Sequence, residues 1–152
     1  MREPVLSLYS DAKAFLRLPG PADPILYVRG TVERVFGAAP FHGAAYLGGS
    51  RSLRGFSRQR FAGDVAVLGS TELYGTFGQL RVRGRPIGFG GMLLADVGRV
   101  YSRGLSVGPR HLGVGGGVWL RDHRTGRELT AAVAQGSRGP RFYIAFGEPF
   151  WR

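Results

Sequence analysis

Residues 46–64 read YLGGSRSLRGFSRQRFAGD, a segment rich in glycine and arginine that lies between two stretches with the alternation of β-strands. Loops of this length inside a compact fold are usually functional or disordered. The loop and its approach carry apolar side chains that a solvated linker would not need, namely Phe41, Tyr46, Leu53, Phe56 and Phe61. The sequence therefore predicts an inward-folding loop at about residues 38–64 and a cavity large enough to hold it.

On both sides of the loop, apolar residues recur with a period of two rather than 3.6, which predicts strands rather than helices. The 26 Gly and 9 Pro also argue against long helices. The alternating stretches are residues 6–18, 26–36, 65–77, 87–101, 114–120, 129–133 and 142–150. Turn-forming residues separate several of them, as at Pro19–Pro24 and Arg124–Arg127. The prediction is an all-β fold, an antiparallel meander of about seven long amphipathic strands.

The predicted strands are longer than the ~5–6 residues usual in globular sheets. Their second face is small and polar, and does not form a second apolar core. A sandwich would bury the bulky face, whereas a barrel in lipid turns it outward around a wet lumen. Alternation alone fits both arrangements. Strand length, glycine content and the aromatic last strand favour the C-terminal part of a transmembrane β-barrel, an incomplete barrel.

The composition limits the other function classes. A net charge of +11, from 21 Lys+Arg against 10 Asp+Glu, requires that nucleic-acid binding be considered. The basic residues are spread along the chain, so this stays the alternative: a soluble arginine-rich β-protein that binds nucleic acid or other polyanions. Arginines next to aromatics, as in Arg54–Phe56 and Arg60–Phe61, give it some support.

Nothing in the sequence points to an enzyme. The absence of cysteine excludes disulfides and thiol catalysis. The three histidines, His42, His111 and His123, lie in separate loops or turns without a metal-binding spacing. We therefore predict no catalytic residue, no metal and no cofactor.

An arginine on an inward-folding loop needs an anion. Glu72 and Asp96 stand on the polar faces of the two strands after the loop, so one carboxylate from each strand could hold the guanidinium of Arg54 by charge-assisted bonds. Gly55 would permit a turn that other residues resist, and Phe56 would pack the loop tip. In the plainer alternative, Glu72 and Asp96 are hydrated side chains in the lumen, and Arg54 is a solvated loop residue that does not contact them.

Several blocks of the chain together resemble the C-terminal barrel of the bacterial surface antigen family, which includes the BamA and TamA outer-membrane assembly proteins and two-partner secretion transporters. The resemblance covers roughly residues 5–151. The loop motif consists of Gly48, Gly49, Leu53, Arg54, Gly55, Phe56, Arg60, Phe61, Gly63 and Asp64. The strand blocks are Glu72–Leu73 and Ala95–Gly98, and the closing strand contributes Phe142, Ile144, Phe146, Phe150 and Trp151.

The resemblance implies a barrel of sixteen antiparallel strands whose sixth extracellular loop folds into the lumen. There the loop arginine meets acidic residues of neighbouring strands, which maps onto Arg54, Glu72 and Asp96. It also implies insertion or secretion of proteins at the outer membrane of a Gram-negative-type bacterium. The implied partners are outer-membrane lipid and unfolded client proteins. Two departures are Leu94, where an aromatic is usual, and Glu148, which interrupts the closing strand.

Seven strands are fewer than that barrel needs. The sequence shows no POTRA domain and no signal peptide, and we expect residues 1–152 to form a partial C-terminal barrel domain. An open sheet in lipid would leave unpaired edges, which the bilayer does not tolerate. A further expected partner is therefore the missing N-terminal half of the barrel, from the same or a separate chain.

Overall fold

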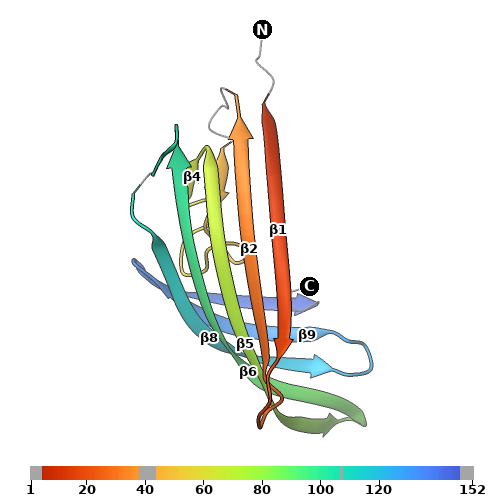
Figure 1. The fold of residues 1–152 in the computed structure, drawn as a ribbon. Coiled ribbons are helices and arrows are strands. Elements are labelled where there is room, and N and C mark those ends of the chain that lie inside the picture. Colours follow the sequence, from red (N-terminus) through yellow and green to blue (C-terminus); the bar gives the residue numbers. More distant parts are fainter. Residues whose placement is uncertain (1–4, 38–43, 107, 148–152) are drawn as a thin grey trace.

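A computed structural model describes residues 5–37, 44–106 and 108–147. These residues form one large antiparallel sheet and a small two-stranded one (Figure 1). The long strands are β1 (Leu6–Arg17), β2 (Ile25–Phe36), β5 (Val65–Val82), β6 (Arg85–Ser102), β8 (His111–Asp122), β9 (Glu128–Gly136) and β10 (Gly139–Gly147). The short ones are β3 (Ala45–Leu47), β4 (Phe61–Gly63) and β7 (Leu105–Ser106).

The large sheet follows the order β1-β2-β5-β6-β8-β9-β10, with β7 paired to the end of β6. Each long strand pairs antiparallel with its neighbours in the chain, so the predicted meander of seven long strands is confirmed. The order starts at β1 and ends at β10, so both strands are edges of an open sheet.

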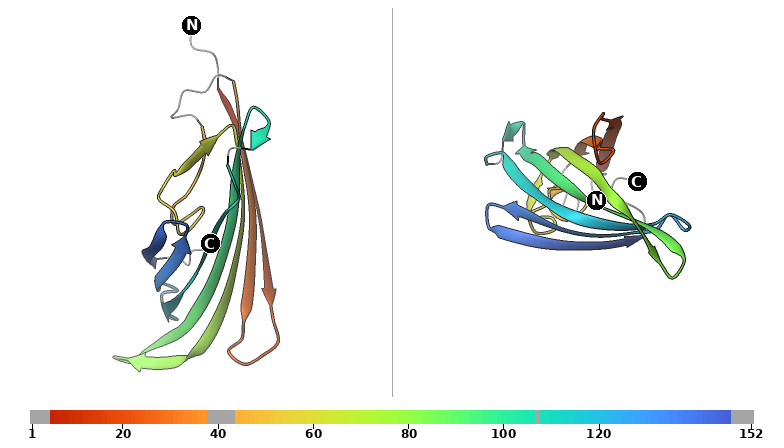
Figure 2. Two further views of the ribbon diagram at one scale, coloured as in Figure 1. Left: turned by 90° about the vertical axis from the view of Figure 1, so that its left-hand side faces the viewer. Right: turned by 90° about the horizontal axis from the view of Figure 1, so that it is seen from below.

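The sheet curls, and β9 and β10 bend toward the side on which the loop between β2 and β5 lies (Figure 2). We call this side the inner face. It carries the buried members of the alternation in the strands between β1 and β10, as in β5, where Ala66, Leu68 and Ser70 are buried between more exposed neighbours. The opposite side, the outer face, carries the exposed valines, leucines and aromatics. The predicted sorting of side chains by parity therefore holds.

Two predicted boundaries were wrong. The strand predicted to end at residue 77 continues to Val82, because a β-bulge between Thr76 and Gly78 shifts the register and breaks the alternation. The strand then turns at Arg83–Gly84, both with positive φ, and returns as β6. Likewise, the residues between the predicted strands 87–101 and 114–120 contain the hairpin strand β7 and the first residues of β8.

Buried side chains gather in two clusters on the inner face. One lies under the loop and combines loop residues with the upper half of the sheet: Val35, Ala45, Leu47, Leu53, Phe56, Ala66, Leu68 and Val100. The other covers the lower half and contains Tyr74, Met92, Leu94, Trp119, Ala132 and Ala134. The loop thus supplies much of the upper core. The prediction that this face forms no apolar core was wrong, because the inward positions also include Leu68, Met92 and Trp119.

Candidate functional site: the inward-folded loop and its acceptors

The loop after β2 folds onto the inner face, and its tip is the most deeply buried part. Strands β3 and β4 pair at its base, with Ala45 opposite Gly63. Between them, Leu53, Arg54 and Phe56 are at most 5% exposed. The apolar content that predicted an inward fold is therefore buried by the sheet.

Arg54 lies between the carboxylates of Glu72 on β5 and Asp96 on β6. Its Nε donates to Asp96 Oδ2 at 2.7 Å and its Nη2 donates to Asp96 Oδ1 at 2.6 Å, a bidentate arrangement. The backbone N–H of Arg54 donates to the same Oδ2 at 2.9 Å. Its Nη1 donates to Glu72 Oε1. The structure thus brings together the three residues that the sequence analysis grouped, and we call Arg54, Glu72 and Asp96 the clamp.

Strand register explains why these two acids meet. Ser70 pairs with Asp96 across β5 and β6, so Glu72 stands two residues further along β5, on the same face and diagonal to Asp96. Glu72 and Asp96 are 3% and 0% exposed. The Tyr74 hydroxyl donates to Glu72 Oε2 at 2.7 Å and so satisfies the second oxygen of that carboxylate.

The Arg54 guanidinium is held in its charged form. Burial alone would lower its pKa, but the bonds to Asp96 and the charges of Asp96 and Glu72 outweigh it, so its pKa lies above the usual value. Removing one partner of such a buried pair costs about 3–5 kcal/mol, because the other charge is left uncompensated. The arrangement can hold the loop against the sheet.

Glycines of the sheet make room for the loop tip. A Cβ on Gly113 of β8 would lie 1.9 Å from the carbonyl oxygen of Arg54. One on Gly136 of β9 would lie 2.3 Å from that of Gly55. A Cβ on Gly98 of β6 would lie 2.9 Å from Leu47 Cδ1. Backbone contact as close as that at Gly113 and Gly136 is open only to glycine, so these two positions let the loop tip lie against β8 and β9.

The loop tip also contacts the last strand. The Gly55 N–H donates to the Tyr143 hydroxyl on β10 at 2.8 Å, and Arg141 Nη2 donates to Ser57 Oγ at 3.0 Å. Gly55 has φ +89°, which suits glycine. Sequence reasoning missed Tyr143, although its place opposite Phe142 in the alternation puts it on the inner face.

The remaining loop-motif residues shape the base of the loop. Gly48 and Gly49 have positive φ, and the Gln59 N–H donates to the Gly48 carbonyl. Phe61 stacks on His111 of β8 with ring centroids 3.6 Å apart. The guanidinium of Arg60 lies 5.9 Å from the Phe61 ring centroid.

Gly63 and Asp64 join the loop to the sheet. The Asp64 N–H donates to the Tyr101 carbonyl, and the Asp64 carboxylate accepts from the Arg103 N–H. A Cβ on Gly63 would lie 2.5 Å from the Tyr101 oxygen, so a larger residue would not fit there.

The closing-strand residues Phe142, Ile144 and Phe146 project from the outer face and are 81%, 80% and 71% exposed. Phe150 and Trp151 lie outside the described residues, as do Phe41, His42 and Glu148. The structure therefore places three of the five predicted closing-strand residues, all on the face opposite the loop.

A second ion pair lies further down the inner face. Arg121 of β8 and Glu128 of β9 stand opposite each other, and Arg121 Nε donates to Glu128 Oε2 at 2.9 Å. The Thr130 hydroxyl donates to Glu128 Oε1, which leaves this carboxylate buried and bonded. Sequence reasoning missed Glu128. Its place next to Leu129, which faces outward, would have put it on the inner face.

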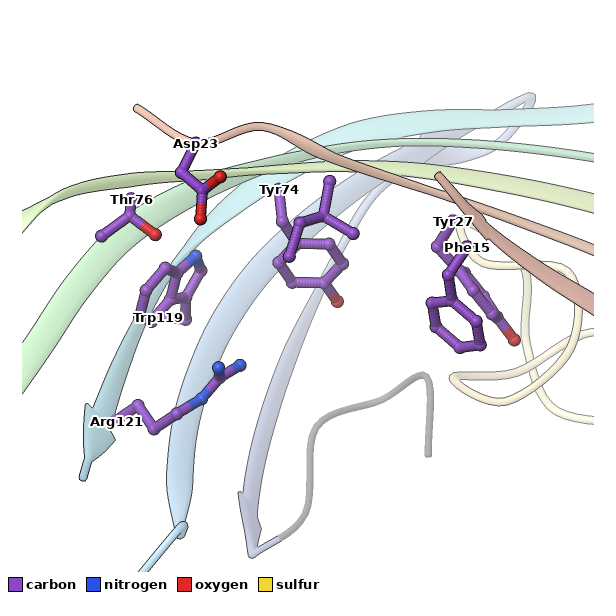
Figure 3. A pocket seen from close by; sticks show the side chains of 8 residues that line it. Phe15, Asp23, Tyr27, Tyr74, Thr76, Trp119 and Arg121 are labelled. Atoms are coloured by element: carbon purple, nitrogen blue, oxygen red, sulfur yellow. The ribbon is translucent and has the colours of Figure 1, made fainter. Parts of the chain in front are cut away.

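Beside this pair, an aromatic pocket opens between the clamp and the lower hairpins. Figure 3 shows its side chains projecting from the same side of the sheet. It is lined by Phe15, Asp23, Ile25, Tyr27, Tyr74, Thr76, Trp119 and Arg121. Trp119 Nε1 donates to the Gly91 carbonyl at 3.2 Å, so this indole N–H is satisfied within the sheet.

The support for nucleic-acid binding weakens at the loop tip. Arg54 and Phe56 are both 5% exposed, so neither can stack on a base in this structure. The described residues contain no group of His, Cys, Asp or Glu side chains that could hold a metal ion. Within the same ranges, no helix is long and apolar enough to cross a membrane.

No family model matches the chain, and no curated protein matches it. The resemblance to the bacterial surface antigen family therefore rests on the loop and strand motifs alone.

Proposed function

We propose that the chain is a segment of a transmembrane β-barrel in the outer membrane, belonging to a factor that inserts or secretes proteins there. The outer face of the sheet carries this proposal. Every long strand exposes large apolar side chains on it, including Leu8 on β1, Val28 on β2, Leu93 on β6, Val118 on β8 and Ile144 on β10. In water such a continuous apolar surface is a liability, whereas lipid chains solvate it.

The width of the apolar band on the outer face also supports the proposal that this face contacts lipid. On β6, the outward positions from Ile87 to Val97 carry no charge and are bounded by Arg85 and Arg99. Ten residue steps at ~3.4 Å span ~34 Å along the strand. At a tilt of about 45°, that length crosses ~24 Å, close to the ~25 Å apolar band of outer-membrane barrels.

The edges support a larger assembly. β1 and β10 each pair with one neighbour within the sheet, which leaves a row of backbone N–H and C=O groups on each. In lipid these groups need partners, because the bilayer core offers none. We assign the partner strands to an N-terminal barrel half, from the same or a separate chain.

The assembly role rests on the resemblance together with the loop. A loop fixed inside a lumen by a buried ion cluster is the arrangement that the family resemblance implies for proteins handling unfolded clients. No group at the clamp suits bond chemistry, so we propose a positioning role for Arg54, Glu72 and Asp96, and no enzymatic activity.

Membrane placement is tested by mixing the full chain, unfolded in urea, with phosphatidylcholine vesicles and floating them through a sucrose gradient at alkaline pH. We expect the chain to float with the vesicles and to resist trypsin. Recovery of all the chain at the bottom of the gradient would contradict the proposal.

The assembly role is tested in the bacterium that carries the chain. An Arg54→Ala codon change should lower the amount of folded outer-membrane barrel proteins, measured by heat-modifiable mobility. The exposed loop change Arg58→Ala serves as control. Unchanged client levels in Arg54→Ala cells, with the clamp demonstrably lost, would refute the assembly role while leaving membrane placement intact.

A further inference from the structure

A groove opens on the outer side of the sheet at the end where the loop begins, with a volume of about 750 Å³. Its lining comes from the end of β2, the start of β5 and the turn after β6, and these strand ends lie at the top of Figure 1. One wall is the end of β2, Arg34–Gly37, and the other is the β6–β7 turn, Tyr101–Gly104. Asp64 and Val65 form its floor.

Backbone bonds fix both walls to the floor. The Val35 N–H donates to the Asp64 carbonyl at 2.8 Å, and the Asp64 N–H donates to the Tyr101 carbonyl at 2.8 Å. The end of β2, which carries Arg34, and the turn that carries Arg103 therefore lie on either side of the start of β5. The groove is held in place by the fold rather than by side-chain packing alone.

Each wall supplies one arginine. The Arg34 guanidinium lies over the Phe36 ring, 4.5 Å from its centroid. Among the described residues, neither Arg34 nor Arg103 forms an ion pair. The groove also contains the Asp64 carboxylate, which accepts the Arg103 backbone N–H at 2.7 Å and so is already bonded.

A third arginine stands one row lower on the outer face. Arg99 lies 5.5 Å from the Tyr101 ring centroid and donates through Nη2 to Ser106 Oγ and the Gly108 carbonyl. Its Nε is buried without a hydrogen-bond partner in the described part of the chain. The excess of positive charge around the groove favours an anion.

The groove opens onto apolar surface. Arg34 is opposite Val65, and the next row toward the middle of the sheet pairs Val32 with Val67. Val32 and Val67 are 44% and 38% exposed. A ligand that places an anionic group between the arginines would therefore lay any attached chain over valines.

We propose that this groove binds the phosphorylated headgroup of a membrane lipid, with its acyl chains along the outer face. The inference rests on the proposed membrane placement and adds a ligand to it. Guanidinium groups bind phosphate oxygens in bidentate fashion. The position just beyond the end of the apolar band, marked by Arg99, is where lipid phosphates lie. A soluble phosphate compound would gain nothing from the valines.

The test is native mass spectrometry of the full chain in detergent with three probes. The probes are phosphatidylglycerol, a diacylglycerol with the same acyl chains, and water-soluble glycerol phosphate. The variant is Arg34→Gln with Arg103→Gln. The control, Arg83→Gln with Arg127→Gln, removes the same charge from exposed turns at the opposite end of the sheet.

We expect phosphatidylglycerol to bind more tightly than the diacylglycerol or glycerol phosphate. The groove variant should lose at least about tenfold in phosphatidylglycerol affinity, whereas the control should stay within about twofold. Arg34→Lys with Arg103→Lys should bind between the two, because it keeps the charge and loses the planar fork.

Equal losses in the groove and control variants would overturn the site, since net charge alone would explain them. Glycerol phosphate binding as tightly as the lipid would overturn the lipid assignment. Vesicle flotation of the same variants separates the two proposals: a chain that floats but shows no groove effect refutes only this inference. A chain that does not float refutes both.

Discussion

At the scale of single residues, the clamp holds one cation against two carboxylates. Asp96 takes three donors from Arg54, and Glu72 shares its oxygens between Arg54 and Tyr74. Every carboxylate oxygen is therefore bonded, although the cluster carries one excess negative charge. Such a cluster contributes to stability only while all its members are present.

Replacing Arg54 by Ala should leave two buried carboxylates without their cation and destabilise the folded chain by about 3–5 kcal/mol. Arg54→Lys should recover part of this, since an ammonium restores the charge but not the bidentate fork. Urea unfolding of vesicle-bound protein, followed by tryptophan fluorescence, measures both.

Arg58→Ala is the matched control, because Arg58 is an exposed arginine in the same loop. We expect its unfolding free energy to stay within about 0.5 kcal/mol of the wild type. Equal stability of Arg54→Ala and Arg58→Ala would show that the buried cluster does not hold the loop.

Gly113→Ala should displace the loop tip without altering the loop sequence. The added methyl group would meet the Arg54 carbonyl at 1.9 Å, a contact that requires the backbone to move. We expect faster proteolysis of the arginine-rich loop by trypsin. Gly30→Ala, on β2 with open space around its Cβ, should leave the cleavage rate unchanged. Equal cleavage rates in both variants would contradict the close fit between loop and β8.

At the scale of elements, the loop links strands that are far apart in the sheet. Its tip bonds to β5 and β6 through Arg54 and to β10 through Tyr143. The edge strand β10 otherwise pairs only with β9 in the sheet. The loop therefore connects the centre of the sheet to its C-terminal edge strand.

Tyr143→Phe removes the hydroxyl that accepts the Gly55 N–H and should weaken the connection between the loop tip and β10. The expected cost is about 1 kcal/mol, the usual net value of one hydrogen bond. Hydrogen exchange should speed up at residues 53–57 and in β10, while β1 and β2 stay as in the wild type. Phe142→Leu, the neighbouring change on the outer face, should leave the loop amides unaffected. Loop exchange that rises equally in both variants would remove Tyr143 from this role.

At the scale of the whole molecule, the two faces of the sheet differ in the way a lipid-embedded wall requires. The inner face carries the buried Arg54–Glu72 and Arg54–Asp96 pairs and the half-buried Arg121–Glu128 pair, whereas the outer face exposes large apolar side chains. A water-soluble sheet would bury its apolar side against a second layer. Here the loop covers only the inner side, where its apolar side chains pack against those of the sheet.

Leu93→Arg places a charge near the middle of the outer band and should weaken membrane insertion by about 2–4 kcal/mol. Val82→Arg, outward at the end of β5 beside the hairpin, should cost at most about 1 kcal/mol. Urea-dependent folding into vesicles measures the difference. Equal effects of the two substitutions would show that the outer face does not cross a bilayer.

Much of the architecture could be predicted from local pattern. The parity of apolar residues in each strand gave the sides of Leu93, Val118 and Ile144, because alternation is a property of the backbone itself. The bulge at Thr76–Gly78 and the extension to Val82 could not be predicted, since an extra residue erases the periodic signal there. Glu128 was missed because the β8–β9 register sets its partner Arg121. Tyr143 was missed because its partner Gly55 reaches it only through the fold of the loop.

The sequence by itself determined which side chains share a face of each strand. It also determined that an arginine on an apolar, inward-folding loop needs an acidic partner. The tertiary structure decided the pairings. Asp96 comes diagonal to Glu72 only through the β5–β6 register, and Gly113 lies under Arg54 only because the loop folds across β8. These contacts join residues distant along the chain, where no local propensity acts and only the packed sheet fixes the geometry.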